Sequence, residues 1–295
     1  MPGRCNCRPM ATLKRRSVVC WLVAVYALTG APPARPAEQA TSTVPATPDA
    51  TAPLRPYTAR YAIYRNGKLT GKVEVTLMQQ GERWVLRSAG SGTHGLARIL
   101  AASDNEEVHG RLQEGHFRPI RYLRHTRVAG IDDRWNVDFD WDTRKVSIVH
   151  DRDEPLVLDM VGDSLDPLSL KLEMRRRLPG AEAPLHFQMV EEDEIDEQNF
   201  RLLPHEWMET SLGCLLTAPV EKVRHNSKRY TRAWHAPALD HIEVRVQHGK
   251  TGGTDLEMRI TELTLDGIDV TPRLGCAALQ ALHDDRSSLP GKPDD

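Results

Sequence analysis

The amino-acid sequence predicts a mainly β protein: a single large antiparallel sheet, built as a curved meander or an open barrel, with one central helix. The first observation is that apolar and polar residues alternate in many short runs, the pattern of strands with one buried and one solvated face. The second is that turn signals rich in Gly, Asn and Pro separate these runs. The third is that one segment, residues 166–178, carries the start and stop signals of a helix.

The predicted strands follow one another along most of the chain. Residues 57–64 alternate first, and Asn66-Gly67 comes directly after them. This dipeptide is a strong hairpin signal because both residues accept a positive φ. Every second residue is apolar in residues 242–247 and again in residues 256–265. The other predicted strands are residues 73–77, 84–86, 135–141, 145–150, 156–160, 215–224 and 230–234.

Two predicted helices interrupt the strands. Residues 95–101 form a short one. In residues 166–178, Asp166 can cap the helix, Pro167 suits the first helical position, and three consecutive arginines from residue 175 suit its C-terminal dipole. Apolar residues spread around most of this second helix. We therefore expect it to be covered widely, on the concave side of the curved sheet.

The N-terminal residues predict export. In residues 1–37, the basic Lys14, Arg15 and Arg16 precede a short apolar run and then small and helix-breaking residues, the order of a secretory signal peptide. We expect cleavage between residues 31 and 38 and a periplasmic protein. An uncleaved membrane anchor is the alternative, which the shortness of the apolar run disfavours.

The rest of the chain divides into three parts. Residues 38–55, rich in Pro, Ala and Thr, predict a flexible linker. Residues 56–270 predict a single β-rich domain. Residues 271–295 predict a C-terminal tail that is partly disordered.

The charge balance argues against nucleic-acid binding. Residues 1–37 hold six of the 39 Lys and Arg and no Asp or Glu, so the remainder carries 33 positive and 41 negative side chains. A nucleic-acid-binding surface is basic, because contacts to phosphate supply much of its affinity. We therefore expect no nucleic-acid partner.

Two cysteines remain after residue 37, Cys214 and Cys276. In an oxidising compartment they can pair as a disulfide. The alternative is that Cys214, which lies among apolar residues, is a small core residue with a free thiol.

Several pieces of the chain, in order, resemble one protein family. They are YAIYRNGKLTGKVEVTL, GTHGLARIL, RPIRY, DPLSLKLEMRRRL and TRAWHAPALDHIEVRVQH. Over residues 56–268 they are similar to the domain of unknown function 3108 family, which are exported envelope proteins of Gram-negative bacteria. The resemblance implies an exported, mainly β protein, and it carries over no catalytic residue. Cys214 departs from the family pattern, so a disulfide there would be particular to this protein.

No complete catalytic motif is found in the sequence. Residues 89–92 (AGSG) lack the first Gly of a nucleophile elbow, and residues 205–209 (HEWME) lack the second His of a zinc-protease helix. The acidic residues 191–197 (EEDEIDE) lack the spacing of a calcium loop and predict a solvated turn. The basic residues 222–232 predict a solvated hairpin, with contact to anionic lipid as the alternative. We therefore predict no catalytic residue, metal ligand or cofactor.

The sequence is compatible with three functions. The first is a non-catalytic binding module or chaperone for a lipid or other apolar ligand, because a curved sheet around an apolar helix can enclose a cavity. The second is an envelope adaptor that binds other proteins through a sheet edge or the basic hairpin, and an enzyme comes third. The candidate ligand-binding residues are large apolar side chains of the helix and the scarce tryptophans: Leu168, Leu172, Trp84, Trp141 and Trp234.

Overall fold

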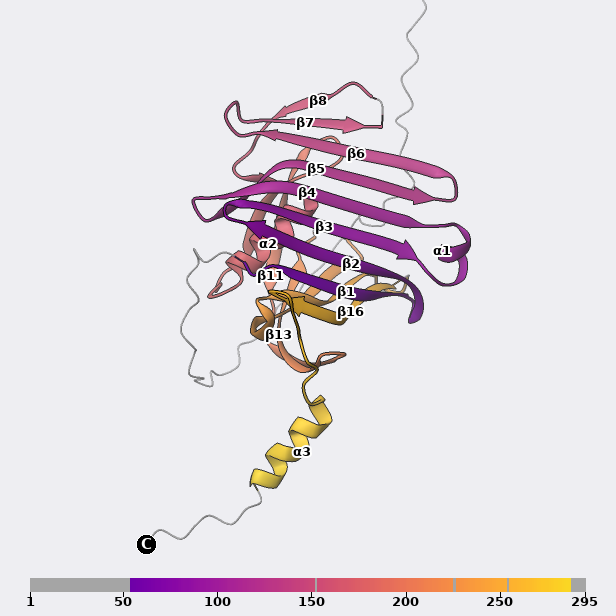
Figure 1. Cartoon of the computed structure of the whole chain (residues 1–295), viewed down its shortest axis with the longest axis vertical. Coiled ribbons are helices and arrows are strands. Elements are labelled where there is room, and N and C mark those ends of the chain that lie inside the picture. Colours follow the sequence, from indigo (N-terminus) through magenta and orange to yellow (C-terminus); the bar gives the residue numbers. More distant parts are fainter. Residues whose placement is uncertain (1–53, 152, 225–226, 254, 288–295) are drawn as a thin grey trace, which may run out of the picture.

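The structure is a computed structural model that describes residues 54–287 except residues 152, 225, 226 and 254. The predicted signal peptide, nearly all of the predicted linker and residues 288–295 lie outside the described residues. Within them the chain forms three α-helices, one short 3₁₀ helix and seventeen strands, which belong to one sheet (Figure 1). The predicted mainly β fold with a single large sheet is confirmed.

The first half of the chain is a meander of long strands with one short helix. Helix α1 is Gly95–Ile99. Strands β1 to β8 are Tyr57–Arg65, Lys68–Gln80, Arg83–Gly92, Ser103–Gln113, His116–Val128, Ile131–Asp140, Lys145–His150 and Leu156–Asp159. Each pairs antiparallel with the next, and Figure 1 shows them as a stack of curved arrows.

The second half contains the central helix α2, Pro167–Arg177, and the remaining strands. Strands β9 to β17 are Ser164–Leu165, Leu185–Val190, Ile195–Leu202, Glu206–Thr210, Gly213–Lys222, Arg229–Ala236, Ile242–Lys250, Asp255–Leu265 and Ile268–Asp269. The 3₁₀ helix η1 (Pro237–Leu239) joins β14 to β15.

The two halves are joined where the first strand pairs with the last long one. Strand β1 lies between β2 and β16, so the sheet continues from β1 through β16, β15 and β14 to β13. There β13 pairs with β12 along its first half and with β11 at its end. Strand β11 pairs with β10, and β10 pairs with β9 in the sheet's one parallel pairing among the described residues. Among the described residues no backbone pairing joins β8 to β9, so the sheet is open between these two strands.

Helix α2 is packed between two parts of the sheet that do not pair with each other. It contacts β4 and β5 on one side and β9 and β10 on the other. Its Leu168 and Leu172 belong to the main core, together with inward-facing residues of the first meander. Its Leu170 and Met174 belong to a second cluster with residues of β10 and β13. The expected wide coverage of this helix is therefore confirmed, and its bounds match the predicted ones within a residue.

The predicted C-terminal tail contains a helix that the prediction did not include. Helix α3, Cys276–Ser287, has twelve residues and extends away from the sheet in Figure 1. Its opening residues are mostly Ala, Leu and Gln, which have high helix propensity. None of the helices in the described part of the chain is both long enough and apolar enough to cross a membrane.

Candidate functional site

The position of α2 is fixed by the residue that precedes it. The Asp166 carboxylate is buried and accepts hydrogen bonds from the backbone N–H groups of Leu168 (2.9 Å) and Ser169 (3.0 Å). The Ser169 hydroxyl donates to the same carboxylate. Because the first backbone N–H groups of a helix have no partner inside it, this cap determines where α2 begins.

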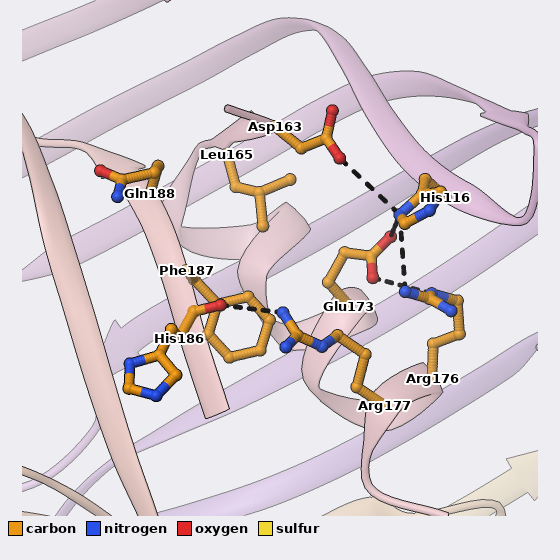
Figure 2. Close-up of a pocket in the computed structure, with 9 residues that line it drawn as sticks. All are labelled: His116, Asp163, Leu165, Glu173, Arg176, Arg177, His186, Phe187 and Gln188. Atoms are coloured by element: carbon orange, nitrogen blue, oxygen red, sulfur yellow. Dashed lines mark hydrogen bonds and ion pairs between the residues drawn. The ribbon is translucent and has the colours of Figure 1, made fainter. Parts of the chain in front are cut away.

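One flank of α2 faces a cavity of about 240 Å³. We call it the α2 cavity. It lies between α2, the start of β5, and strands β9 and β10 (Figure 2). The lining residues are His116, Asp163, Leu165, Glu173, Arg176, Arg177, His186, Phe187 and Gln188.

A buried carboxylate forms the polar centre of the α2 cavity. Glu173 accepts a hydrogen bond from the backbone N–H of Phe117 (2.7 Å) and pairs with the guanidinium of Arg176 (2.7 Å). His116 lies beside this pair, with its Nδ1 at 3.6 Å from a Glu173 oxygen and 3.9 Å from an Asp163 oxygen. Figure 2 shows these four side chains converging on one side of the cavity. A buried carboxylate with both a cation and a backbone donor is well compensated.

The other side of the α2 cavity combines an aromatic ring with a cation. The Arg177 guanidinium lies 4.6 Å from the centre of the Phe187 ring and donates a hydrogen bond to the His186 carbonyl (2.8 Å). Phe187 and Leu165 are both buried and form the apolar part of the lining. A guanidinium stacked on a ring keeps its remaining N–H groups free to point elsewhere.

The lining can recognise a ligand that has an apolar part and a polar group. Arg176, Arg177 and Gln188 offer donors, and Asp163 and Glu173 offer acceptors. The nine lining residues include no Ser, Thr, Cys or Lys that could act as a nucleophile next to His116. Among the described residues, no group of three or more His, Cys, Asp or Glu is placed to hold a metal ion.

The five predicted ligand-binding residues lie elsewhere. Leu168, Leu172, Trp84 and Trp234 are at most 3% exposed and belong to the main core. Trp141 is partly buried and donates from its indole Nε1 to the Pro119 carbonyl (2.6 Å). None of the five lines the α2 cavity or a second cavity of about 420 Å³ bounded by β1, β12, β15 and β16.

The residues that do line the α2 cavity were not singled out from the sequence. They come from four short segments, and among them only Arg176 and Arg177 belong to a sequence signal, the basic end of the helix. The signal that was available is the placement of Glu173 and Arg176 three residues apart, which puts both on one helix face.

A disulfide joins Cys214 in β13 to Cys276 at the start of α3, with the two Cα atoms 4.7 Å apart. Backbone hydrogen bonds hold the segment just before α3 against β13, from the Cys214 N–H to the Leu274 carbonyl and from the Arg273 N–H to the Leu212 carbonyl (both 2.9 Å). The C-terminal segment is therefore attached to the sheet by both a covalent bond and backbone pairing.

The fold and the cavity together define a class of protein: an open, strongly curved β-sheet with an embedded helix and a small polar cavity beside that helix. Within this class the chain belongs to the family described as protein of unknown function DUF3108, whose model matches residues 57–261. No curated protein matches the chain.

Two solved structures resemble this fold at low sequence identity. One is the crystal structure of a β-barrel-like protein of domain of unknown function DUF1849 from Brucella abortus, with 9% identity and a TM-score of 0.49, covering 72% of this chain and 98% of that one. The other is a protein with a YmcC-like fold from Bacteroides fragilis, with 10% identity and a TM-score of 0.28, covering 70% of this chain and 95% of that one.

Proposed function

We propose that this chain is an exported, non-catalytic binding protein of the cell envelope, whose ligand is a lipid or another molecule with both an apolar part and a polar group. The observation that carries the proposal is the α2 cavity, in which an apolar floor of Phe187 and Leu165 faces the side chains of Arg176, Arg177 and Asp163. Binding sites for small molecules combine apolar walls with a few placed polar groups in this way.

The size of the α2 cavity limits what it holds. Its volume of about 240 Å³ is below the range of roughly 300–1,000 Å³ that is common for drug-sized ligands. We therefore propose that it takes a polar headgroup and a short adjoining apolar segment, and that the rest of a larger ligand stays outside.

Export is supported by two features far apart in the sequence. Residues 1–37 have the order of a secretory signal peptide, and the Cys214–Cys276 disulfide suits an oxidising compartment such as the periplasm. N-terminal sequencing of the protein recovered from a periplasmic fraction should give a first residue between 32 and 38. A mature chain that still carries Lys14 would contradict export with cleavage.

The binding proposal is tested by native mass spectrometry of the gently purified mature protein. We expect a bound molecule to appear as an added mass. We expect Arg177→Ala to reduce the occupied fraction by about tenfold, because the variant loses one charge-assisted contact to the ligand. Arg111→Ala is the matched control, because Arg111 is exposed and does not line the cavity. The proposal would be rejected if the wild-type protein showed no added mass, or if both variants lost the same share of the occupied fraction.

An envelope adaptor is a second candidate, favoured by one exposed apolar pair. Trp207 (65% exposed) lies directly opposite Leu216 (37% exposed) in the β12–β13 pairing, and Leu274 (51% exposed) belongs to the segment that packs against β13. Large exposed aromatics of this kind are typical of protein interfaces. A partner of defined stoichiometry in native mass spectra, lost in Trp207→Ala but retained in Arg177→Ala, would favour this function over the first.

A further inference from the structure

A second polar region lies on the face of β13–β15 that is turned towards α2, away from the α2 cavity. In β13, Val220 is buried in the same apolar cluster as Leu170 and Met174 of α2. Side chains two residues apart on a strand point to the same side of the sheet. Lys222, at the end of β13, therefore projects from the same face as Val220, and the intervening Glu221 projects from the opposite face, where it pairs with Arg201 and Arg232.

The neighbouring strands place two more polar side chains next to Lys222. Glu221 pairs with Arg232 in β14, so Lys222 comes beside Thr231, and Thr231 pairs with His248 in β15. The Thr231 hydroxyl and the His248 Nδ1 are 3.0 Å apart. Lys222, Thr231 and His248 thus form one row across three strands.

Two further cations act on this row. Arg224 is two residues beyond Lys222, and Lys171 comes from α2. Burial, followed by the positive charges of Lys171, Arg224 and Lys222, lowers the pKa of His248 to about 4. Burial and then the charge of Arg224 also lower the pKa of Lys222. The three cations therefore act on the same small region. We call Lys222, Arg224, Thr231 and His248 the basic row.

The carboxylates that face the basic row do not pair with its two cations. Glu243 pairs with Lys171 (3.4 Å). Glu191 and Asp196 contribute negative charge near Lys222, and Glu191 does so near Arg224. In the described part of the chain, no hydrogen bond or ion pair joins a carboxylate to the Lys222 ammonium or the Arg224 guanidinium. The Arg224 Nη1 is buried without a hydrogen-bond partner. A buried N–H donor of a cation without an acceptor is costly, so an anion bound at this position would be stabilising.

We propose that the basic row is a binding site for an oxyanion, a phosphate or phosphate monoester held by Lys222 and Arg224, with Thr231 and His248 as further hydrogen-bond partners. Arg supplies a planar fork and Lys a mobile ammonium, a pair of donors suited to phosphate oxygens. The site lies on the other side of α2 from the α2 cavity, because Lys171 and Glu173 point about 160° apart on the helix. It does not depend on the ligand proposed for that cavity.

The test uses two probes on the purified mature chain. One is inorganic phosphate, and the other is dihexanoyl phosphatidic acid below its critical micelle concentration, with dihexanoyl phosphatidylcholine as the zwitterionic control. The imidazole signals of His248 are followed by NMR across a pH titration with and without each probe, and affinities are measured by calorimetry at two salt concentrations. Equal affinity for both probes identifies a free oxyanion as the ligand, and at least tenfold tighter binding of the phosphatidic acid identifies a lipid headgroup.

We expect saturable, salt-sensitive binding that raises the pKa of His248, because a bound anion offsets the three cations. Lys222→Gln and Arg224→Gln should each weaken binding by about tenfold or more. Lys228→Gln is the matched control, since Lys228 is an exposed lysine of the same hairpin, and it should change the affinity by less than about twofold.

Three results would overturn the proposal. They are a His248 pKa that neither probe shifts, equal weakening by all three variants, and binding that survives Lys222→Gln combined with Arg224→Gln. Lys222→Arg, which keeps the charge, guards against a folding artefact, because it should retain binding when Lys222→Gln loses it.

Discussion

Asp166 has two opposite influences on the stability of this protein. Its carboxylate caps α2, which stabilises the helix, yet it is fully buried, which disfavours its ionised form. Burial prevails over the hydrogen bonds from Ser169 and Leu168 and raises the pKa of Asp166 to about 6. Between pH 4 and 6 the folded state therefore holds a proton that the unfolded state has released, so this residue makes the protein less stable as pH rises through that range.

The first prediction tests this fall in stability between pH 4 and pH 6. Asp166→Asn keeps an acceptor for the Leu168 and Ser169 N–H groups but cannot ionise. In the wild type, Asp166 should make the free energy of unfolding fall by roughly 3 kcal/mol between pH 4 and pH 6, and the variant should lack this fall. At pH 7 the variant should be at least as stable as the wild type. Urea unfolding at several pH values measures this. Identical pH profiles for the two proteins would show that folding does not raise the pKa of Asp166.

Two histidines have the reverse effect. Burial, together with neighbouring cationic and histidine side chains, lowers the pKa values of His241 and His248 to about 4. Below pH 6.5 these histidines become protonated in the unfolded chain but stay neutral in the folded protein. Stability therefore falls as the pH drops from 6.5 to 4.

The second prediction is that His248→Gln reduces the loss of stability at acidic pH by up to roughly 3 kcal/mol. The amide that replaces the imidazole still reaches the Thr231 hydroxyl. The slope of the unfolding free energy against pH, between 6.5 and 4.5, is the quantity to compare. Asp166→Asn is the matched control because it changes the same slope in the opposite direction. An unchanged slope in His248→Gln would contradict a half-buried histidine that stays neutral in the folded protein.

At the scale of elements, α2 is held mainly by its apolar residues. Leu172 is completely buried in the main core, whereas Leu96 in α1 is 68% exposed. We expect Leu172→Ala to lower the free energy of unfolding by about 2–5 kcal/mol, and Leu96→Ala, the matched leucine-to-alanine control in a helix, to cost less than about 0.5 kcal/mol. Guanidinium unfolding of both variants provides the comparison. Similar small losses in both would mean that α2 is loosely packed and that Leu172 faces a void.

Alternation of apolar residues was enough to predict most strands but not all of them. The alternation does not predict strands β4, β5, β10, β11 and β12. In β4, Ser103–Gln113, the inward-facing positions include Asp104 and Glu106 where apolar residues would be expected. These carboxylates are satisfied across the sheet: Asp104 pairs with Arg124 (3.0 Å), and Glu106 accepts from the Tyr122 hydroxyl (3.0 Å). A buried polar pair replaces an apolar contact without changing the strand, so period-two hydrophobicity cannot detect it.

The cavity was less accessible to sequence reasoning than the fold. The helix end signals at Asp166 and Pro167 are local and were sufficient to place α2. By contrast, His116, Asp163 and Phe187 meet only because β5, the β8–β9 connection and β10 converge around that helix. Contacts between residues so far apart in the chain leave no periodic pattern. Leu168 and Leu172 are predicted as ligand-binding residues by their apolar character alone, which core residues share.

For the molecule as a whole, the disulfide closes a loop of 62 residues that contains β14, β15 and β16. In the chain-entropy account, a loop of that length stabilises the folded state by about 4 kcal/mol through its effect on the unfolded chain. We expect Cys214→Ser with Cys276→Ser to lose an amount of that order in urea unfolding. Dithiothreitol should destabilise the wild type equally and leave the double variant unaffected. A wild type insensitive to reductant would show that the two thiols are not bonded in solution.

The placement of β1 between β2 and β16 has a consequence for how the protein reaches this structure. Strand β1 is synthesised before the other strands, but one of its two neighbours, β16, lies about 200 residues further along the chain, as in the pairing of Tyr57 with Leu265. Until that segment has been made, one edge of β1 offers unpaired backbone groups and buried-face residues such as Tyr61 to any other strand. Folding should therefore be slow, should finish only after the whole domain is available, and should leave nascent or truncated chains dependent on chaperones. A chain ending before Asp255 is expected to aggregate, although it retains all eight strands of the first meander.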